Sequence, residues 1–171
     1  MPGEPRMDVA NAAASHAAES PTNSVLTGER PNFTAPNCTV TVLAVSPFDE
    51  DHVFLTHLFS HSNWRIHQAR SYGEALSVLQ HHPIAVVLCD AETADSGWKP
   101  MLAELERLPH SPLLIVTSRL ADDSLWAEVL NLGGYDVLMK PFDRVEVLRV
   151  ISLAWLHWKG QREGVARRAA G

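Results

Sequence analysis

The sequence lacks several features that would define a class of function on their own. It has no apolar run near the roughly 20 residues of a membrane span, and two cysteines are too few for a disulfide framework. A formal net charge of -6 argues against a general nucleic-acid-binding protein. Residues 1–37 lack the basic start and apolar core of a signal peptide, so we expect a cytoplasmic protein.

Composition divides the chain into three parts. Residues 1–37 are rich in Ala, Ser, Pro, Asn and Glu without apolar periodicity, which predicts a disordered N-terminal extension. Residues 38–158 carry regular apolar patterns and form the predicted domain, in which Cys38 and Cys89 fit buried free thiols. Residues 159–171 form a basic C-terminal tail that could continue the last helix, whose C-terminus favours cations.

Five short apolar segments alternate with five helical patterns in the domain. The runs at 40–45, 84–90 and 112–117 are typical of strands buried on both faces. Segments 64–69 and 135–139 are predicted as the other two strands, and the last helix is predicted over 143–158. Strict alternation predicts parallel strands with right-handed crossovers, and therefore an α/β three-layer sandwich around a five-stranded parallel sheet.

Polar side chains stand where these predicted strands end. Ser46 follows the first strand, Asp90 ends the third, Thr117 ends the fourth and Lys140 follows the fifth. The carboxyl ends of parallel strands meet at one edge, which is where ligands bind in open α/β sheets. An aspartate oxygen can attack phosphorus to give an acyl phosphate. A hydroxyl and an ammonium can bind the phosphoryl oxygens, so this edge predicts phosphoryl transfer.

Over about residues 39–158 the sequence resembles the receiver domain of two-component response regulators. The resemblance is carried by the segments Val-Val-Leu-Cys-Asp90, Ile-Val-Thr117-Ser118 and Gly-Gly-Tyr-Asp-Val-Leu-Met-Lys140-Pro-Phe. It implies a flavodoxin-like topology with Asp90 as phospho-acceptor, Thr117 as the hydroxyl that moves toward the phosphoryl group, and Lys140 as its ion partner. It also implies a Lys140-Pro141 bond that is often cis.

The chain departs from this family at the metal site. Receivers hold Mg²⁺ with a pair of acids after the first strand, but Ser46-Pro47 occupies that place and supplies no carboxylate. The alternative reading is that Ser46 caps the first helix, that Pro47 starts it, and that the following acids complement the helix dipole.

Other acids could replace the missing pair. Asp49, Glu50 or Asp51 could reach back from the first helical turn. Glu92 stands where the family uses a backbone carbonyl on Mg²⁺. We therefore take Asp90, Glu92 and Asp49 as the candidate metal ligands and leave open whether Mg²⁺ binds.

A second departure concerns the activation switch. Val137 falls three residues before Lys140, where receivers often carry a Tyr or Phe that rotates inward on activation. Tyr135 lies two residues earlier, which predicts the same face of the strand, and it could substitute in part or serve only as a packed aromatic residue.

The resemblance implies a signalling module rather than an enzyme. We expect a single-domain response regulator that takes a phosphoryl group on Asp90 from a histidine kinase or phosphotransfer protein and docks on a downstream partner. The alternative is a pseudo-receiver, a protein-interaction module that works without phosphorylation. A flavin- or nucleotide-binding enzyme is disfavoured because no glycine-rich loop follows the first strand.

Apolar residues off the core faces of the last two helices predict a docking surface. Trp126 on the fourth helix and Val150 on the last helix are the expected contributors. A homodimer through these helices is one use of such a surface, and ordinary packing within a thick layer is the alternative.

Overall fold

The computed structural model describes residues 39–93 and 97–170. Five parallel strands form one sheet in the order β2-β1-β3-β4-β5. The strands are β1 (Thr41–Val45), β2 (Arg65–Ala69), β3 (Val86–Asp90), β4 (Leu113–Ser118) and β5 (Asp136–Met139). The helices are α1 (Asp49–Phe59), α2 (Tyr72–His81), α3 (Lys99–Glu106), α4 (Asp123–Leu132) and α5 (Arg144–Ala169). The predictions for residues 1–37 and for Cys38 lie outside the described residues.

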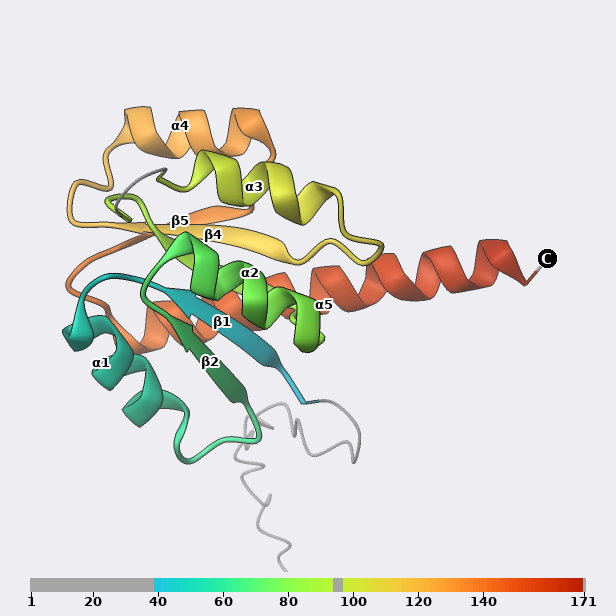
Figure 1. The fold of residues 1–171 in the computed structure, drawn as a ribbon, viewed down its shortest axis with the longest axis horizontal. Helices are drawn as coiled ribbons and strands as arrows, with labels where there is room; N and C mark the ends of the chain where they lie inside the picture. The colour runs from blue at the N-terminus through green and yellow to red at the C-terminus, as the bar shows by residue number, and fades with distance from the viewer. Residues whose placement is uncertain (1–38, 94–96, 171) are drawn as a thin grey trace, which may run out of the picture. The chain divides into compact units, whose positions relative to one another are not determined.

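The sheet lies between two layers of helices, as Figure 1 shows. One apolar cluster joins the sheet to α1 and α5, and a second joins the opposite face to α2, α3 and α4. The predicted three-layer α/β sandwich is therefore confirmed, with the flavodoxin-like strand order that the resemblance implies.

Strand β3 is the centre of this arrangement. It pairs with β1 on one side and β4 on the other, and all five of its residues are buried. A strand covered on both faces is apolar along its length, which explains the unbroken apolar run before Asp90. The single charge in β3 is Asp90, at its carboxyl end.

Local sequence signals set several helix ends. Ser71 caps α2 by accepting a hydrogen bond from the backbone N–H of Glu74 at 3.3 Å. Asp122 caps α4 in the same way through Leu125 at 2.8 Å. Helix α4 ends at Gly133, whose φ of 101° lies in the left-handed region that glycine adopts without strain.

The start of α1 differs from the capping alternative. Phe48, rather than Ser46, is the N-cap residue, and no side chain caps the helix there. Pro47 lies outside the helix, which begins at Asp49. The prediction that Ser46 caps the helix was wrong. The Ser46 hydroxyl instead donates a hydrogen bond to the carboxylate of Asp51 at 2.5 Å.

Helix α5 is longer than the predicted 143–158. It runs to Ala169, so residues 159–169 continue the helix, and in Figure 1 this part extends past the sheet. The prediction placed the end where the apolar stripe ends at Trp158, because burial was its main signal. Within the described residues, no helix combines the length and apolar character needed to cross a membrane.

The predicted docking surface is corrected at one residue. Val150 is only 2% exposed and packs in the core, so it does not contribute to a surface. Trp126 and Leu153 are about half exposed, at 51% and 48%. The surface of the last two helices therefore keeps apolar side chains, and the contact through them stays a prediction.

Candidate functional site

The sheet brings three of the predicted site residues to one edge. Asp90 in β3 is the register partner of Thr117 in β4. Lys140 follows β5, and its backbone N–H donates to the carbonyl oxygen of Ser118 at 2.9 Å. All three side chains belong to buried residues, with exposures of 2%, 3% and 6%. The parallel topology is the physical reason that residues far apart in the sequence meet here.

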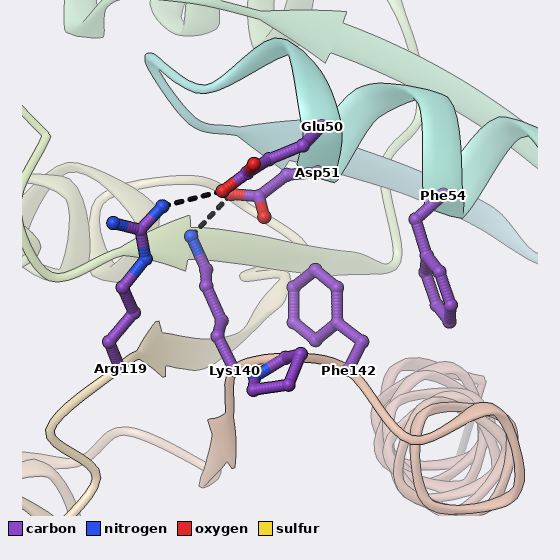
Figure 2. A pocket seen from close by; sticks show the side chains of 7 residues that line it. Glu50, Asp51, Phe54, Arg119, Lys140 and Phe142 are labelled. Atoms are coloured by element: carbon purple, nitrogen blue, oxygen red, sulfur yellow. Dashed lines mark hydrogen bonds and ion pairs between the residues drawn. The ribbon is translucent and has the colours of Figure 1, made fainter.

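Lys140 connects two carboxylates at this edge. Its ammonium makes hydrogen-bonded ion pairs with the Oδ2 atoms of both Asp90 and Asp51. Figure 2 shows the lysine side chain running up from the end of β5 to meet Asp51 on α1. The Lys140-Pro141 peptide bond is cis, as the resemblance implies.

Asp51 is held in place from the loop between β1 and α1. The Ser46 hydroxyl donates to Asp51 Oδ2, and the same hydroxyl accepts from the backbone N–H of Phe48 at 3.2 Å. The Nε2 atom of buried His52 lies 2.8 Å from the carbonyl oxygen of Ser46, so Nε2 carries the proton of that bond. These bonds fix the carboxylate of Asp51 toward the strand edge.

Burial makes the charge balance of this cluster important. Two carboxylates and one ammonium leave a net charge of about -1 in a site where all three side chains are 6% exposed or less. Two unit charges about 4 Å apart interact by about 4 kcal/mol at an effective dielectric constant of about 20. The lysine therefore both attracts each carboxylate and offsets the repulsion between them.

Two predicted metal ligands lie differently from Asp51. Asp49 pairs with Arg70 on the surface, where its side chain is 75% exposed, so the structure does not bring it to the site. Glu92 is exposed, and its backbone N–H donates to Asp90 Oδ1 at 2.8 Å. Glu92 thus touches the site through its backbone rather than through its carboxylate.

Of the acids in the first helical turn that the sequence offered, the structure brings Asp51 rather than Asp49 to the strand edge, and the sequence contained a signal for this placement. Asp51, Leu55 and Leu58 are spaced i, i+4 and i+7, which places them on one face of α1. Leu55 and Leu58 are buried core residues, at 1% and 5% exposure. A helix that buries this face carries Asp51 inward and leaves Asp49 in solvent.

Arg119 and Phe48 belong to the site and were not anticipated. The Arg119 guanidinium lies 4.7 Å from the centre of the Phe48 ring, and the Lys140 ammonium lies 5.0 Å from the same centre. Arg119 also pairs with Glu50 at 2.5 Å. The contacts of Arg119 with Phe48 and Glu50 join segments distant in sequence, so no local pattern could have predicted them.

A pocket of about 520 Å³ opens beside this cluster. Figure 2 shows that its walls come from α1 and from the segments after β4 and β5, with the cations Arg119 and Lys140 on one side and the rings of Phe54 and Phe142 on the other. It is lined by Glu50, Asp51, Phe54, Arg119, Lys140, Pro141 and Phe142. The cluster is therefore reachable from the surface although its polar side chains are buried.

The chemistry of the edge depends on the carboxylate rather than on the neighbouring thiol. Cys89 precedes Asp90 and is 1% exposed. Burial raises the pKa of the Cys89 thiol to about 12, so it stays protonated and is a poor nucleophile at neutral pH. Cys89 is therefore set aside as a nucleophile, and Asp90 stays the predicted acceptor.

The β5 aromatic that the family uses as a switch has no counterpart here. Val137 packs with the cluster under α2, α3 and α4, whereas Tyr135 packs with the cluster under α1 and α5. The expectation that Tyr135 shares a face with Val137 was wrong, because β5 begins only at Asp136. The Tyr135 ring instead lies edge-on to His157, with ring centres 5.7 Å apart.

The oxygen donors at the edge suit a magnesium ion. Mg²⁺ is commonly held by one or two carboxylates together with water and substrate phosphate. Asp51 and Asp90 are two such carboxylates, brought together by Lys140. Over residues 39–93 and 97–170, no group of three His, Cys, Asp or Glu side chains is suited to a metal ion. The residues fit Mg²⁺ with phosphate, and they do not form a cage built by the protein alone.

Comparison with known proteins agrees with this fold. The model of the response regulator receiver domain family matches residues 49–152. No curated protein matches the chain. Among solved structures, the chain is similar to the signal receiver domain of an HD domain-containing protein from Pseudomonas fluorescens Pf-5, at 26% identity. That match has a TM-score of 0.68 and covers 77% of this chain and 98% of the other.

A second solved structure shows the same fold at lower identity. It is a CheY-like response regulator receiver domain protein from Methanospirillum hungatei JF-1, at 17% identity and a TM-score of 0.65, with 72% of this chain and 99% of the other covered. The strand order and the Asp90–Lys140 ion pair at the carboxyl edge of the sheet agree with a receiver domain, a class of signalling domain. The chain belongs to the response regulator receiver domain family.

Proposed function

We propose that this receiver accepts a phosphoryl group on Asp90 from a histidine kinase or phosphotransfer protein and signals by docking on a downstream protein. The observation that supports it most is the buried ion pair between Asp90 and Lys140, beside Thr117 at the carboxyl edge of the sheet. The ion pair orients the Asp90 carboxylate, and its partner Lys140 lines the pocket beside it.

The transfer proceeds by displacement at phosphorus. An Asp90 oxygen forms the new P–O bond, and the bond from phosphorus to the donor nitrogen or oxygen breaks with its electron pair staying on the donor. The product is an acyl phosphate, which carries about one more negative charge than the carboxylate. Lys140 donates to its phosphoryl oxygens, and the Thr117 hydroxyl donates a further hydrogen bond.

Asp51 takes the part of the acid pair that the loop lacks. Together with Asp90 and the backbone carbonyl of Glu92 it would hold Mg²⁺, which supplies positive charge to the phosphoryl oxygens when bound. The Ser46 hydroxyl keeps the Asp51 carboxylate aimed at the edge. Ser46-Pro47 therefore replaces the acid pair in sequence, and a carboxylate five residues after Ser46 replaces it in space.

Incubation with acetyl phosphate and Mg²⁺ tests this proposal. We expect the intact mass of the protein to rise by one phosphoryl group, in a form that hydroxylamine removes as it removes other acyl phosphates. The Asp90→Asn variant keeps the size and hydrogen-bonding capacity of the side chain but loses the nucleophile, so it should show no gain.

Two other outcomes would contradict the proposal in different ways. A gain that persists in Asp90→Asn would place the acceptor at another residue. A folded wild-type protein without any gain would favour the pseudo-receiver alternative, in which the same edge has a structural role and docking does not depend on phosphorylation.

A further inference from the structure

The first turn of α1 is tied to three different loops by charge. Its three consecutive acids each pair with a cation, and each cation comes from a segment after a different strand. The pairs are Asp49 with Arg70 after β2, Glu50 with Arg119 after β4, and Asp51 with Lys140 after β5. The first two pairs are mostly exposed and are screened by solvent, so only the third holds the turn strongly.

The cation of that third pair is shared with the phosphoryl acceptor. Lys140 contacts Asp51 and Asp90 through a single ammonium. A phosphoryl group on Asp90 brings three strong acceptor oxygens and additional negative charge into the same buried space. The ammonium has only three protons, so the new oxygens compete directly with Asp51 for it.

A second cation stands beside the first. Arg119 and Lys140 lie against the same Phe48 ring, and both line the pocket next to the cluster. Figure 2 shows the Arg119 guanidinium and the Lys140 ammonium side by side, pointing to the acids of α1. New negative charge at Asp90 attracts both cations away from the turn that they now hold.

We propose that phosphorylation of Asp90 is transmitted through the first turn of α1. Lys140 passes from Asp51 to the phosphoryl group, and the turn from Phe48 to His52 loses its buried ion pair with the segment after β5. This inference rests on the proposed function. The β5 position that would carry an aromatic switch holds Val137, and Tyr135 packs on the opposite face of the sheet. Helix α1 is bonded directly to Lys140, the ion partner of Asp90, through Asp51.

Hydrogen exchange of the full chain, measured with and without acetyl phosphate, tests the inference. Mg²⁺ is saturating in both samples, so that its contact with Asp51 is the same and the difference reports the Lys140–Asp51 ion pair. Intact mass of the same samples reports how much protein is phosphorylated. In phosphorylated protein we expect the amides of residues 48–56 to exchange roughly tenfold faster, which is the effect of losing one charge-assisted hydrogen bond. Amides of α4 should change less.

Matched variants make the assignment specific. Asp51→Asn removes the anchor without phosphorylation, so residues 48–56 of this unphosphorylated variant should already exchange at the faster rate. Asp49→Asn alters an exposed pair in the same turn and should exchange like wild type. Phosphorylated protein with unchanged exchange in α1 would overturn this inference alone, whereas protein that gains no phosphoryl mass would overturn the proposed function and this inference with it.

Discussion

Replacing Lys140 with methionine should lower the free energy of unfolding by about 3–5 kcal/mol, the cost of breaking a buried ion pair by removing one partner. Methionine keeps most of the apolar stem but leaves Asp51 and Asp90 without their shared cation. Both carboxylates are 6% exposed or less, so solvent cannot replace the lost ion pairs. Chemical denaturation monitored by circular dichroism gives the difference.

The chain offers a matched control and a compensating variant for this experiment. Lys99 pairs with Glu128 at 2.5 Å with about half of each side chain exposed, so Lys99→Met should cost no more than about 1 kcal/mol. Adding Asp51→Asn to Lys140→Met removes one of the two stranded charges and should recover part of the loss. Equal costs for Lys140→Met and Lys99→Met would show that the lysine does not hold two buried carboxylates.

The Asp51→Asn variant should bind Mg²⁺ at least about tenfold more weakly than wild type. Changes in the outer shell of a metal site alone cost about 10–100-fold in affinity, and Asp51 is placed as a direct ligand. Asparagine has the same shape and can still accept the bond from Ser46, so the loss reports the charge of the carboxylate. Isothermal titration calorimetry measures the affinity without any phosphoryl donor.

Asp49→Asn is the matched control because it removes the same charge two residues away. Asp49 pairs with Arg70 in solvent rather than with the strand edge, so its variant should bind Mg²⁺ as wild type does. If the two variants lose affinity equally, general electrostatics rather than coordination by Asp51 would explain the binding. Retention of full affinity in Asp51→Asn would contradict the substitution of the acid pair.

The sequence predicted the meeting of Asp90, Thr117 and Lys140 because that meeting follows from the topology of the sheet. Alternating strand and helix patterns determine that the strands are parallel, and parallel strands bring their carboxyl ends to one edge. That was enough to place Asp90, Thr117 and Lys140 together. The roles predicted for them came from the residue type at each strand end together with the family resemblance.

The part that was missed depends on where one helix begins. With α1 starting at Pro47, Ser46 would cap the helix and Asp49 would be the acid nearest the edge. The helix starts at Asp49 instead, which turns Asp51 inward and gives Ser46 a different partner. Sequence pattern places a helix end only to within one or two residues, so the capping pattern alone did not fix which acid faces the edge. The spacing of Asp51 with Leu55 and Leu58 was the sequence signal that pointed to Asp51.

The contacts of Arg119 could not be predicted from sequence, and the continuation of α5 past Trp158 was predicted only as a possibility, from the basic tail. Arg119 meets Phe48 and Glu50 across about 70 residues of chain, a contact that only the folded sheet brings about. The end of α5 beyond Trp158 has no buried stripe, so the periodicity that predicts helices gave no sign of it.

A crystal structure of the chain with Mg²⁺ and beryllium fluoride, which mimics an aspartyl phosphate, would test the central claim most directly. We expect the fluoride group on Asp90 with Lys140 donating to it, and a magnesium ion about 2.1 Å from oxygens of Asp51 and Asp90. An ion bound through Asp49, or a lysine that stays on Asp51 while Asp90 carries the fluoride group, would contradict the account.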